Sequence, residues 1–282
     1  MNEDFKKDFD SYLEYLRKSV EILCTNYGKI GGLWFDGNWS KPDEDWKEAE
    51  LYATIRKHQP EAMIINNTGL NARGELGNPE IDAVTFEQDR PEPLNREGMS
   101  KYITAEMCQT VNDHWGIGIN DLNYKAPREL IENLCLCRKV GANYLLNIGP
   151  TAQGGIDEFQ KALFGIIGRW TDIFGEAIYN GRPYTVADNG KNFILKSTDG
   201  KSLYLFCFDL GLRGNENVTV NNQISGNTAF TNVPDRVTEI KWIDNQEVLE
   251  FTQENNSLAV NFTGHNYGES YCVRVAKAKI ED

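Results

Sequence analysis

The fold is decided by residues 30–36, Ile-Gly-Gly-Leu-Trp-Phe-Asp, a short apolar run that ends in a carboxylate. A run of this length followed by a turn at Gly37-Asn38 predicts a short buried strand. Upstream, apolar side chains recur at three- and four-residue spacing from Phe5 to about Tyr27, which predicts an amphipathic helix that ends at Gly28. The chain therefore opens with a helix followed by a strand.

The same alternation of strands and helices continues through the first part of the chain. Further strands are predicted at 62–66, 81–87, 102–109 and 143–148, and further helices at about 46–57, 127–140 and 157–174. Elements of these lengths in this order predict parallel βα units, either an open doubly wound sheet or a (β/α) barrel. No glycine-rich phosphate-binding fingerprint follows any of the strands, which argues against a nucleotide-binding protein.

The pattern changes near Gly181, where the helical periodicity ends. Short alternating stretches follow at 192–196, 202–208, 218–220, 239–243, 258–262 and 271–276. Turn residues separate them at intervals typical of an antiparallel sandwich. The sequence thus predicts two domains, a βα domain at 1–180 and a β-sandwich domain at 181–282.

The charge of the chain limits its partners. The formal net charge is −13 at pH 7, which repels phosphate backbones and anionic membranes, so we expect neither nucleic acid nor a membrane as partner. Only three histidines are present and the cysteines lack metal-ligand spacing, so we expect no metal and no cofactor. The first residues do not resemble a signal peptide, which predicts a cytoplasmic protein, or a secreted one whose leader has been lost.

Polar side chains close four of the predicted strands: Asp36, Asn66, Glu87 and Asn147. In a barrel, side chains at the carboxyl ends of strands face the mouth of the active site. Two carboxylates are the minimal set for glycoside hydrolysis, and tryptophans supply apolar platforms for a sugar ring; the candidates are Asp36, Glu87, Trp39, Trp46 and Trp115. An acid pair alone is weak support, because acids in loops commonly cap turns or face solvent.

Three motifs give these acids a context. They are Tyr-Gly-Lys-Ile-Gly-Gly-Leu-Trp-Phe-Asp-Gly at 27–37, Ala-Glu-Met-Cys-Gln-Thr at 105–110 leading to His-Trp-Gly at 114–116, and Gly-Ala-Asn-Tyr-Leu-Leu-Asn-Ile-Gly-Pro at 141–150. With these motifs in this order, the chain resembles the α-L-fucosidases of glycoside hydrolase family 29 over about residues 10–180. The resemblance implies a retaining enzyme that removes α-linked L-fucose from fucosylated oligosaccharides or glycoconjugates through a covalent glycosyl–enzyme.

The resemblance also implies roles for single residues. Asp36 is the expected nucleophile. Glu87 and Glu106 compete for the acid/base role, and Glu87 is preferred because it ends a clean strand in a motif, Thr-Phe-Glu-Gln, that resembles the one carrying the acid in relatives. Glu106 is then expected to bind substrate, and further candidates for substrate contact are Trp39, Asn66, His114 and Trp115. For His114, a structural role in its loop is equally open.

Relatives carry the Trp-Phe-Asp-Gly motif at the end of the fourth barrel strand. The expected fold class is therefore α/β, a partial (β/α)8 barrel that lacks its first strands, followed by an antiparallel β-sandwich. The family's N-terminal histidines and tryptophan, which bind fucose hydroxyls, have no counterpart here. An incomplete barrel leaves unpaired sheet edges, so the alternatives are a homo-oligomer, a complementing N-terminal fragment, or a non-catalytic fucose-binding, glycan-binding or scaffold protein. A retaining glycosidase for another sugar is a third reading.

Overall fold

The computed structural model describes residues 3–187, 190–214 and 227–281. It divides into two compact units, Met1–Gln109 and Thr110–Asp282. The predicted strand at 218–220 lies outside the described residues. Within them, no helix combines the length and apolar character needed to cross a membrane.

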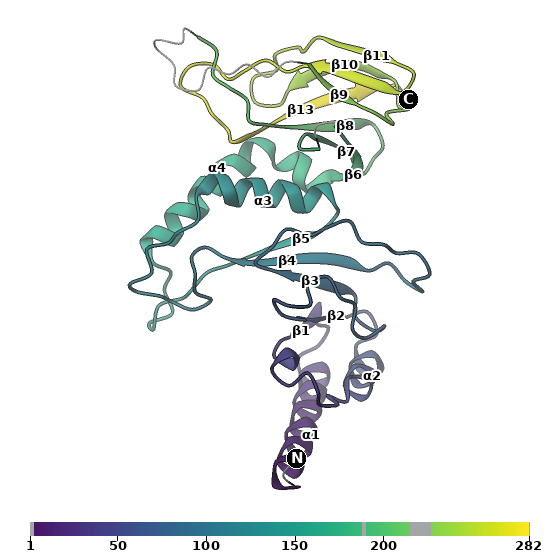
Figure 1. Ribbon diagram of the computed structural model, residues 1–282, viewed down its shortest axis with the longest axis vertical. Helices are drawn as coiled ribbons and strands as arrows, with labels where there is room; N and C mark the ends of the chain where they lie inside the picture. Colours follow the sequence, from purple (N-terminus) through teal and green to yellow (C-terminus); the bar gives the residue numbers. More distant parts are fainter. Residues whose placement is uncertain (1–2, 188–189, 215–226, 282) are drawn as a thin grey trace. The chain divides into compact units, whose positions relative to one another are not determined.

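The first unit is built on parallel strands. Its elements are α1 (Glu3–Asn26), β1 (Gly32–Phe35), the short 3-10 helix η1 (Asn38–Ser40), α2 (Glu48–His58), β2 (Met63–Asn66), β3 (Ala83–Glu87) and β4 (Thr104–Thr110). Strands β1, β2, β3 and β4 pair in that order and all run in one direction (Figure 1). Because they are parallel, the side chains that follow their carboxyl ends gather along a single edge of the sheet.

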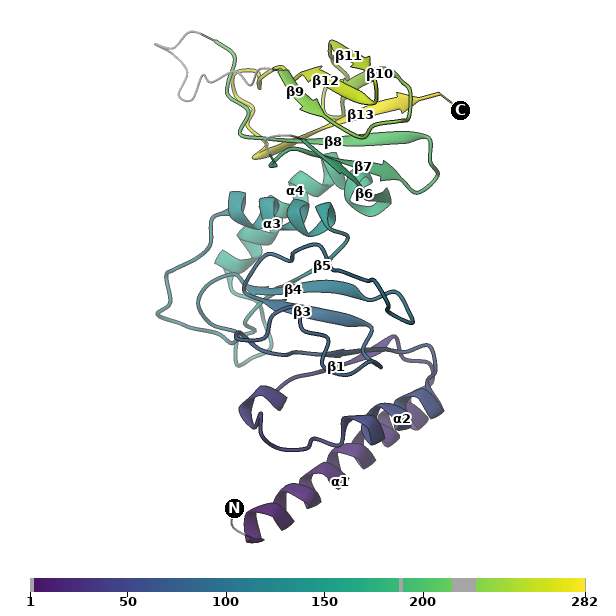
Figure 2. The ribbon, with the colours of Figure 1, turned by 45° about the vertical axis from the view of Figure 1, so that its right-hand side comes forward.

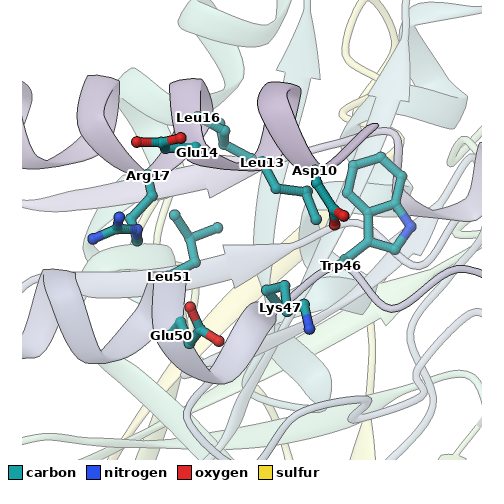
Figure 3. A pocket seen from close by; sticks show the side chains of 9 residues that line it. All are labelled: Asp10, Leu13, Glu14, Leu16, Arg17, Trp46, Lys47, Glu50 and Leu51. Atoms are coloured by element: carbon teal, nitrogen blue, oxygen red, sulfur yellow. The ribbon is translucent and has the colours of Figure 1, made fainter. Parts of the chain in front are cut away.

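Helix α1 packs along α2 through the apolar stripe that the sequence predicts. Phe9, Leu13, Val20 and Cys24 are buried on this stripe, and Gly28, at φ 76°, adopts the left-handed conformation that follows many helix ends. A groove of about 270 Å³ lies between the helices, with Leu13 and Leu51 pointing into it (Figure 3). The groove is lined by residues of α1, α2 and the segment just before α2, and by none that follows a strand's carboxyl end.

The second unit begins with two helices and a strand and continues as antiparallel sheets. Its elements are α3 (Pro127–Lys139), β5 (Asn143–Asn147), α4 (Glu158–Asn180), β6 (Gly181–Val186), β7 (Phe193–Ser197), β8 (Ser202–Phe208), β9 (Asn227–Phe230), β10 (Val237–Trp242), β11 (Phe251–Glu254), β12 (Ser257–Asn261) and β13 (Val273–Ile280). Strands β6 to β13 form a five-stranded sheet in the order β10-β13-β8-β7-β6 and a three-stranded sheet in the order β11-β12-β9.

Both faces of the five-stranded sheet are buried. The three-stranded sheet covers one face, where Leu205, Phe230 and Trp242 pack together. Helices α3 and α4 cover the other, where Trp170 and Phe174 meet Phe206 (Figure 2). This double cover explains why β8 is almost continuously apolar instead of alternating.

A parallel βα region followed by antiparallel sheets agrees with the predicted fold class at this level. The change to antiparallel strands falls at residue 181, where α4 ends and β6 begins. The compact units nevertheless divide after Gln109, because α3 and α4 bury their apolar faces against the five-stranded sheet. The domain boundary near 181 stays a prediction.

Candidate active site

Two carboxylates at the carboxyl edge of the parallel sheet share one amide group. Asp36 directly follows β1, Asn67 follows β2 and Glu87 ends β3. The Nδ2 atom of Asn67 donates to Asp36 Oδ1 at 3.1 Å and to Glu87 Oε2 at 2.7 Å. Because an amide nitrogen carries two hydrogens, each carboxylate receives its own bond. The shared nitrogen limits the separation of the two oxygens to about 5.8 Å.

The orientation of this amide is fixed from behind. Asn67 is buried, and its Oδ1 accepts from the Thr85 hydroxyl at 2.9 Å and from the backbone N–H of Gly69 at 3.3 Å. A backbone N–H can only donate, so the oxygen of the amide must face it. The nitrogen is thereby turned toward the carboxylates. Asn67 thus forms a hydrogen-bonded bridge that fixes the distance between Asp36 and Glu87.

Asp36 is exposed and is held by neutral donors. Besides Asn67, it accepts a hydrogen bond from Trp39 Nε1 at 2.7 Å. The turn between them uses Gly37 at φ 105°, a conformation that favours glycine. Within the described residues, neither Asp36 nor Glu87 has a lysine, arginine or histidine nitrogen within 4.0 Å of its carboxylate. The nearby Arg73 contacts Glu87 at its backbone carbonyl, to which its Nε donates at 2.6 Å.

Glu106 lies deeper on the same face. On β4 it stands opposite Thr85, two residues before Glu87 on β3. It is 5% exposed, and its Oε1 accepts from Trp34 Nε1 at 2.8 Å. Burial, followed by the charges of Glu87, Glu106 and Asp36, raises the pKa of the Cys108 thiol to about 12. Three acids therefore surround a small region, with Glu106 at its base.

Asn66, predicted to contact substrate, lies on the opposite face. Its Nδ2 donates to Glu48 Oε1 at 2.9 Å and to the Tyr52 hydroxyl at 2.8 Å, both on α2. Successive side chains of a strand point to opposite faces, so Asn66 turns to the helix when Asn67 turns to the acids. The structure thus brings Asn67, and not Asn66, beside the carboxylates. The two adjacent asparagines in the sequence already indicate that only one of them can lie on the same face of the sheet as Asp36.

The other predicted residues form a separate group in the second unit. His114 Nδ1 lies 2.7 Å from Asp121 Oδ2, and this hydrogen bond, with backbone N–H donors, lowers the pKa of the Asp121 carboxyl. Trp115 is 42% exposed, and its carbonyl accepts from Asn147 Nδ2 at 2.7 Å at the end of β5. A Cβ at Gly149 would lie 2.5 Å from the Gly116 backbone, so only glycine permits this approach. The loop carrying His114 and Trp115 is thereby fixed to the end of β5.

Across the described ranges, no three side chains of histidine, cysteine, aspartate or glutamate gather in a way that could hold a metal ion. The first unit offers paired carboxylates with a tryptophan beside them.

Comparison with known proteins identifies the family of the chain. The family model described as Alpha-L-fucosidase matches residues 1–176. The chain belongs to the α-L-fucosidase family. The matched region contains both sheet-edge acids, Glu106, Trp39 and the His114-Trp115 loop, and it ends within α4, before the antiparallel sheets.

Relatives of this α-L-fucosidase family member include tissue alpha-L-fucosidase of Rattus norvegicus, 31% identical over 184 residues, covering 61% of this chain and 37% of the relative. Alpha-L-fucosidase of Dictyostelium discoideum is 28% identical over 204 residues, covering 70% and 42%. The chain thus spans well under half the length of the curated relatives it matches.

Solved fucosidase structures share the fold. Alpha-L-fucosidase isoenzyme 1 from Paenibacillus thiaminolyticus has a TM-score of 0.72 at 27% identity, covering 97% of this chain and 63% of the other. A family 29 alpha-L-fucosidase from Bacteroides thetaiotaomicron has a TM-score of 0.74 at 20% identity, covering 100% and 62%. The likeness extends over the antiparallel sheets as well as the parallel one, because nearly the whole chain is covered.

Proposed function

We propose that this member of the α-L-fucosidase family hydrolyses terminal α-linked L-fucose from oligosaccharides or glycoconjugates with retention of configuration. The carboxylate pair joined by Asn67 carries the proposal. Retaining glycosidases place their two carboxyl groups about 5 to 5.5 Å apart, whereas inverting ones need about 6.5 to 9.5 Å. The distance between Asp36 Oδ1 and Glu87 Oε2, at most about 5.8 Å, supports the spacing of a retaining enzyme.

Asp36 is the nucleophile in this proposal. Its carboxylate is exposed, and hydrogen bonds from Trp39 and Asn67 hold its Oδ1 and leave the other oxygen available. That oxygen attacks the anomeric carbon of fucose as the glycosidic bond breaks. The leaving oxygen takes a proton from the second acid, which then removes a proton from the water that releases fucose from Asp36.

Glu87 fits the acid/base role better than Glu106. Glu87 is half-buried and shares the Asn67 amide with Asp36, which sets the spacing that the two-step reaction needs. Glu106 is buried against Trp34, below Glu87 on the same face. We therefore assign Glu106 to the base of the fucose pocket, where it positions the sugar or the indole of Trp34.

The covalent route has a parallel among the structural neighbours. A family 29 fucosidase from Bacteroides thetaiotaomicron, with a TM-score of 0.75 and 20% identity, has been captured as a trapped covalent intermediate with a fluorinated fucosyl fluoride. By analogy, strands β1–β4 belong to a (β/α)8 barrel, which needs further strands to close. A longer polypeptide, a complementing N-terminal fragment or a second copy of the chain would supply them.

Hydrolysis of an aryl α-L-fucoside by the purified chain tests the proposal. Asp36→Ala should abolish turnover, and Glu87→Ala should regain activity on a substrate with a good leaving group when azide is added. Rescue of Glu106→Ala instead would transfer the acid/base role to Glu106. Saturable fucose binding without any turnover would favour a non-catalytic binding protein, and faster cleavage of a galactoside would point to another sugar.

A further inference from the structure

A second cavity of the first unit is lined by Trp39, the residue that donates to Asp36. The loops that follow β1 and β2 enclose a groove of about 520 Å³, which we call the Trp39 groove, lined among others by Trp39, Trp46, Thr68 and Glu75. Both loops leave the carboxyl edge of the sheet, the edge on which Asp36, Asn67 and Glu87 lie. Trp39 belongs to the groove wall and also donates to Asp36. The Trp39 indole therefore links the groove wall to the proposed nucleophile.

The walls of the Trp39 groove combine an exposed indole with polar groups. Trp39 is 52% exposed, and one side of its ring is backed by Gly69, where a Cβ would lie 3.0 Å from the indole. Trp46 is held in place by its Nε1 bond to the Lys41 carbonyl at 3.1 Å. Flat apolar surfaces with a few polar groups beside them are the chemistry that packs against sugar rings.

The charged side chains that line the Trp39 groove are all acidic. Its lining includes four acids and no lysine or arginine: Glu44, Asp45, Glu48 and Glu75. Asp45 has Lys47 at 3.3 Å, just outside the groove lining. In the described part of the chain, Glu44 and Glu75 have no cationic nitrogen within 4.0 Å. A ligand carrying negative charge would meet a repulsive field here, while a neutral one would not.

We propose that the Trp39 groove receives the sugar to which the fucosyl group is attached, and that its acids select a neutral sugar over one carrying sulfate or carboxylate. The inference rests on the proposed function, because it places the leaving group beside Asp36. Attraction comes from stacking on Trp39 and Trp46, and discrimination comes from the uncompensated charges of Glu44 and Glu75.

The test compares two substrates that differ in one charge. One is an α-L-fucosyl N-acetyllactosamine, and the other carries a sulfate on the sugar that bears the fucose. At low ionic strength we expect kcat/KM to be about 10-fold higher for the neutral compound, and salt should reduce this ratio. The double variant Glu44→Gln/Glu75→Gln should lower the ratio to about 3-fold or less. The matched double variant Glu250→Gln/Glu254→Gln removes the same charge in the second unit and should keep it.

The outcomes separate this inference from the proposed function. Equal kcat/KM for the two compounds, or a ratio that the Glu44/Glu75 change does not move, overturns the inference although aryl fucoside hydrolysis stands. If no aryl fucoside is cleaved, the proposed function fails, and dissociation constants of the same two compounds from calorimetry take the place of kcat/KM. Equal affinities would then overturn the inference, and a preference for the neutral compound that Glu44→Gln/Glu75→Gln removes would support it.

Discussion

The two edges of the parallel sheet differ in the groups that contact their carboxylates. At the amino edge, Asp82 accepts from Arg56 Nη2 at 2.7 Å, from Lys101 Nζ at 2.8 Å and from the backbone N–H of Ile64 at 2.8 Å. At the carboxyl edge, the Asp36 and Glu87 carboxylates accept from the neutral N–H groups of Trp39 and Asn67, and Arg73 donates to the Glu87 backbone carbonyl. The sheet thus pairs the Asp82 carboxylate with cations at its amino edge, whereas neutral donors hold the carboxylates at the edge where we place the chemistry.

This contrast also appears in the pKa of Asp82. Partial burial acts to raise it, but hydrogen bonds from Lys101, Arg56 and Ile64, with the charge of Arg56, outweigh burial and lower the pKa of Asp82. A carboxylate whose charged form is favoured in the folded state stabilises that state. The amino edge should therefore govern stability, and the carboxyl edge should govern turnover.

The largest expected effect is that of Asp36→Asn. Loss of the nucleophile should lower kcat for an aryl fucoside by on the order of 10⁴-fold, because no covalent intermediate can form. The free energy of unfolding in urea should change by less than about 0.5 kcal/mol, since the exposed side chain has no ion pair to lose. A variant that stays active would show that the carboxyl edge is not the site of reaction.

The next effect comes from the bridge between the two acids. Asn67→Ala removes the shared donor and lets the carboxylates drift, so kcat should fall by about 10²-fold. Asn66→Ala is the matched control on the same strand: it breaks the bonds to Glu48 and Tyr52 and should cost about 1 to 3 kcal/mol of stability with little change in kcat. Steady-state kinetics and urea unfolding on both variants give the comparison. Similar kcat values for the two would contradict a bridging role for Asn67.

At the amino edge, Asp82→Asn should destabilise the protein by about 2 kcal/mol, because Arg56 and Lys101 lose a partly buried partner. The folded variant should keep kcat within about 2-fold, since the substitution is at the opposite end of the strands. Thermal or urea unfolding, with activity measured well below the transition, would check this. A loss of kcat without a loss of stability would contradict the assignment of stability to the amino edge and turnover to the carboxyl edge.

The smallest effect is a difference in acid sensitivity. The pKa of Asp82 in the folded protein is below its ordinary value of about 3.9, so its contribution is complete above that pH and is lost as the pH falls through the folded pKa. The wild type should therefore lose slightly more stability than Asp82→Asn between about pH 4 and pH 2. Urea midpoints measured across this range would show the difference, and parallel curves would refute it.

Much of the first unit could be predicted from the sequence because its signals are local. Apolar runs ended by Asp36 and Glu87 indicate strands with acids at their ends, and the observed β1 and β3 end at or next to these residues. The family suggested by the motifs is confirmed. The catalytic roles of the two acids stay predictions.

The remaining features depend on how distant segments pack. The choice of Asn67 over Asn66 depends on which face of β2 meets β3. The bond between Trp34 and Glu106 joins residues 72 positions apart in the sequence. The grouping of α3 and α4 with the antiparallel sheets follows from the cluster around Trp170, which no local pattern specifies.

The adjacent asparagines at the end of β2 make that strand's alignment critical. A slip of one residue would exchange the two amides, sending the bridge toward α2 and the helix ligand toward the acids. Composition, apolar content and strand length would all be preserved, yet the carboxylates would lose their spacer. A single-residue insertion or deletion between α2 and β2 should therefore be tolerated by folding far better than by the proposed turnover.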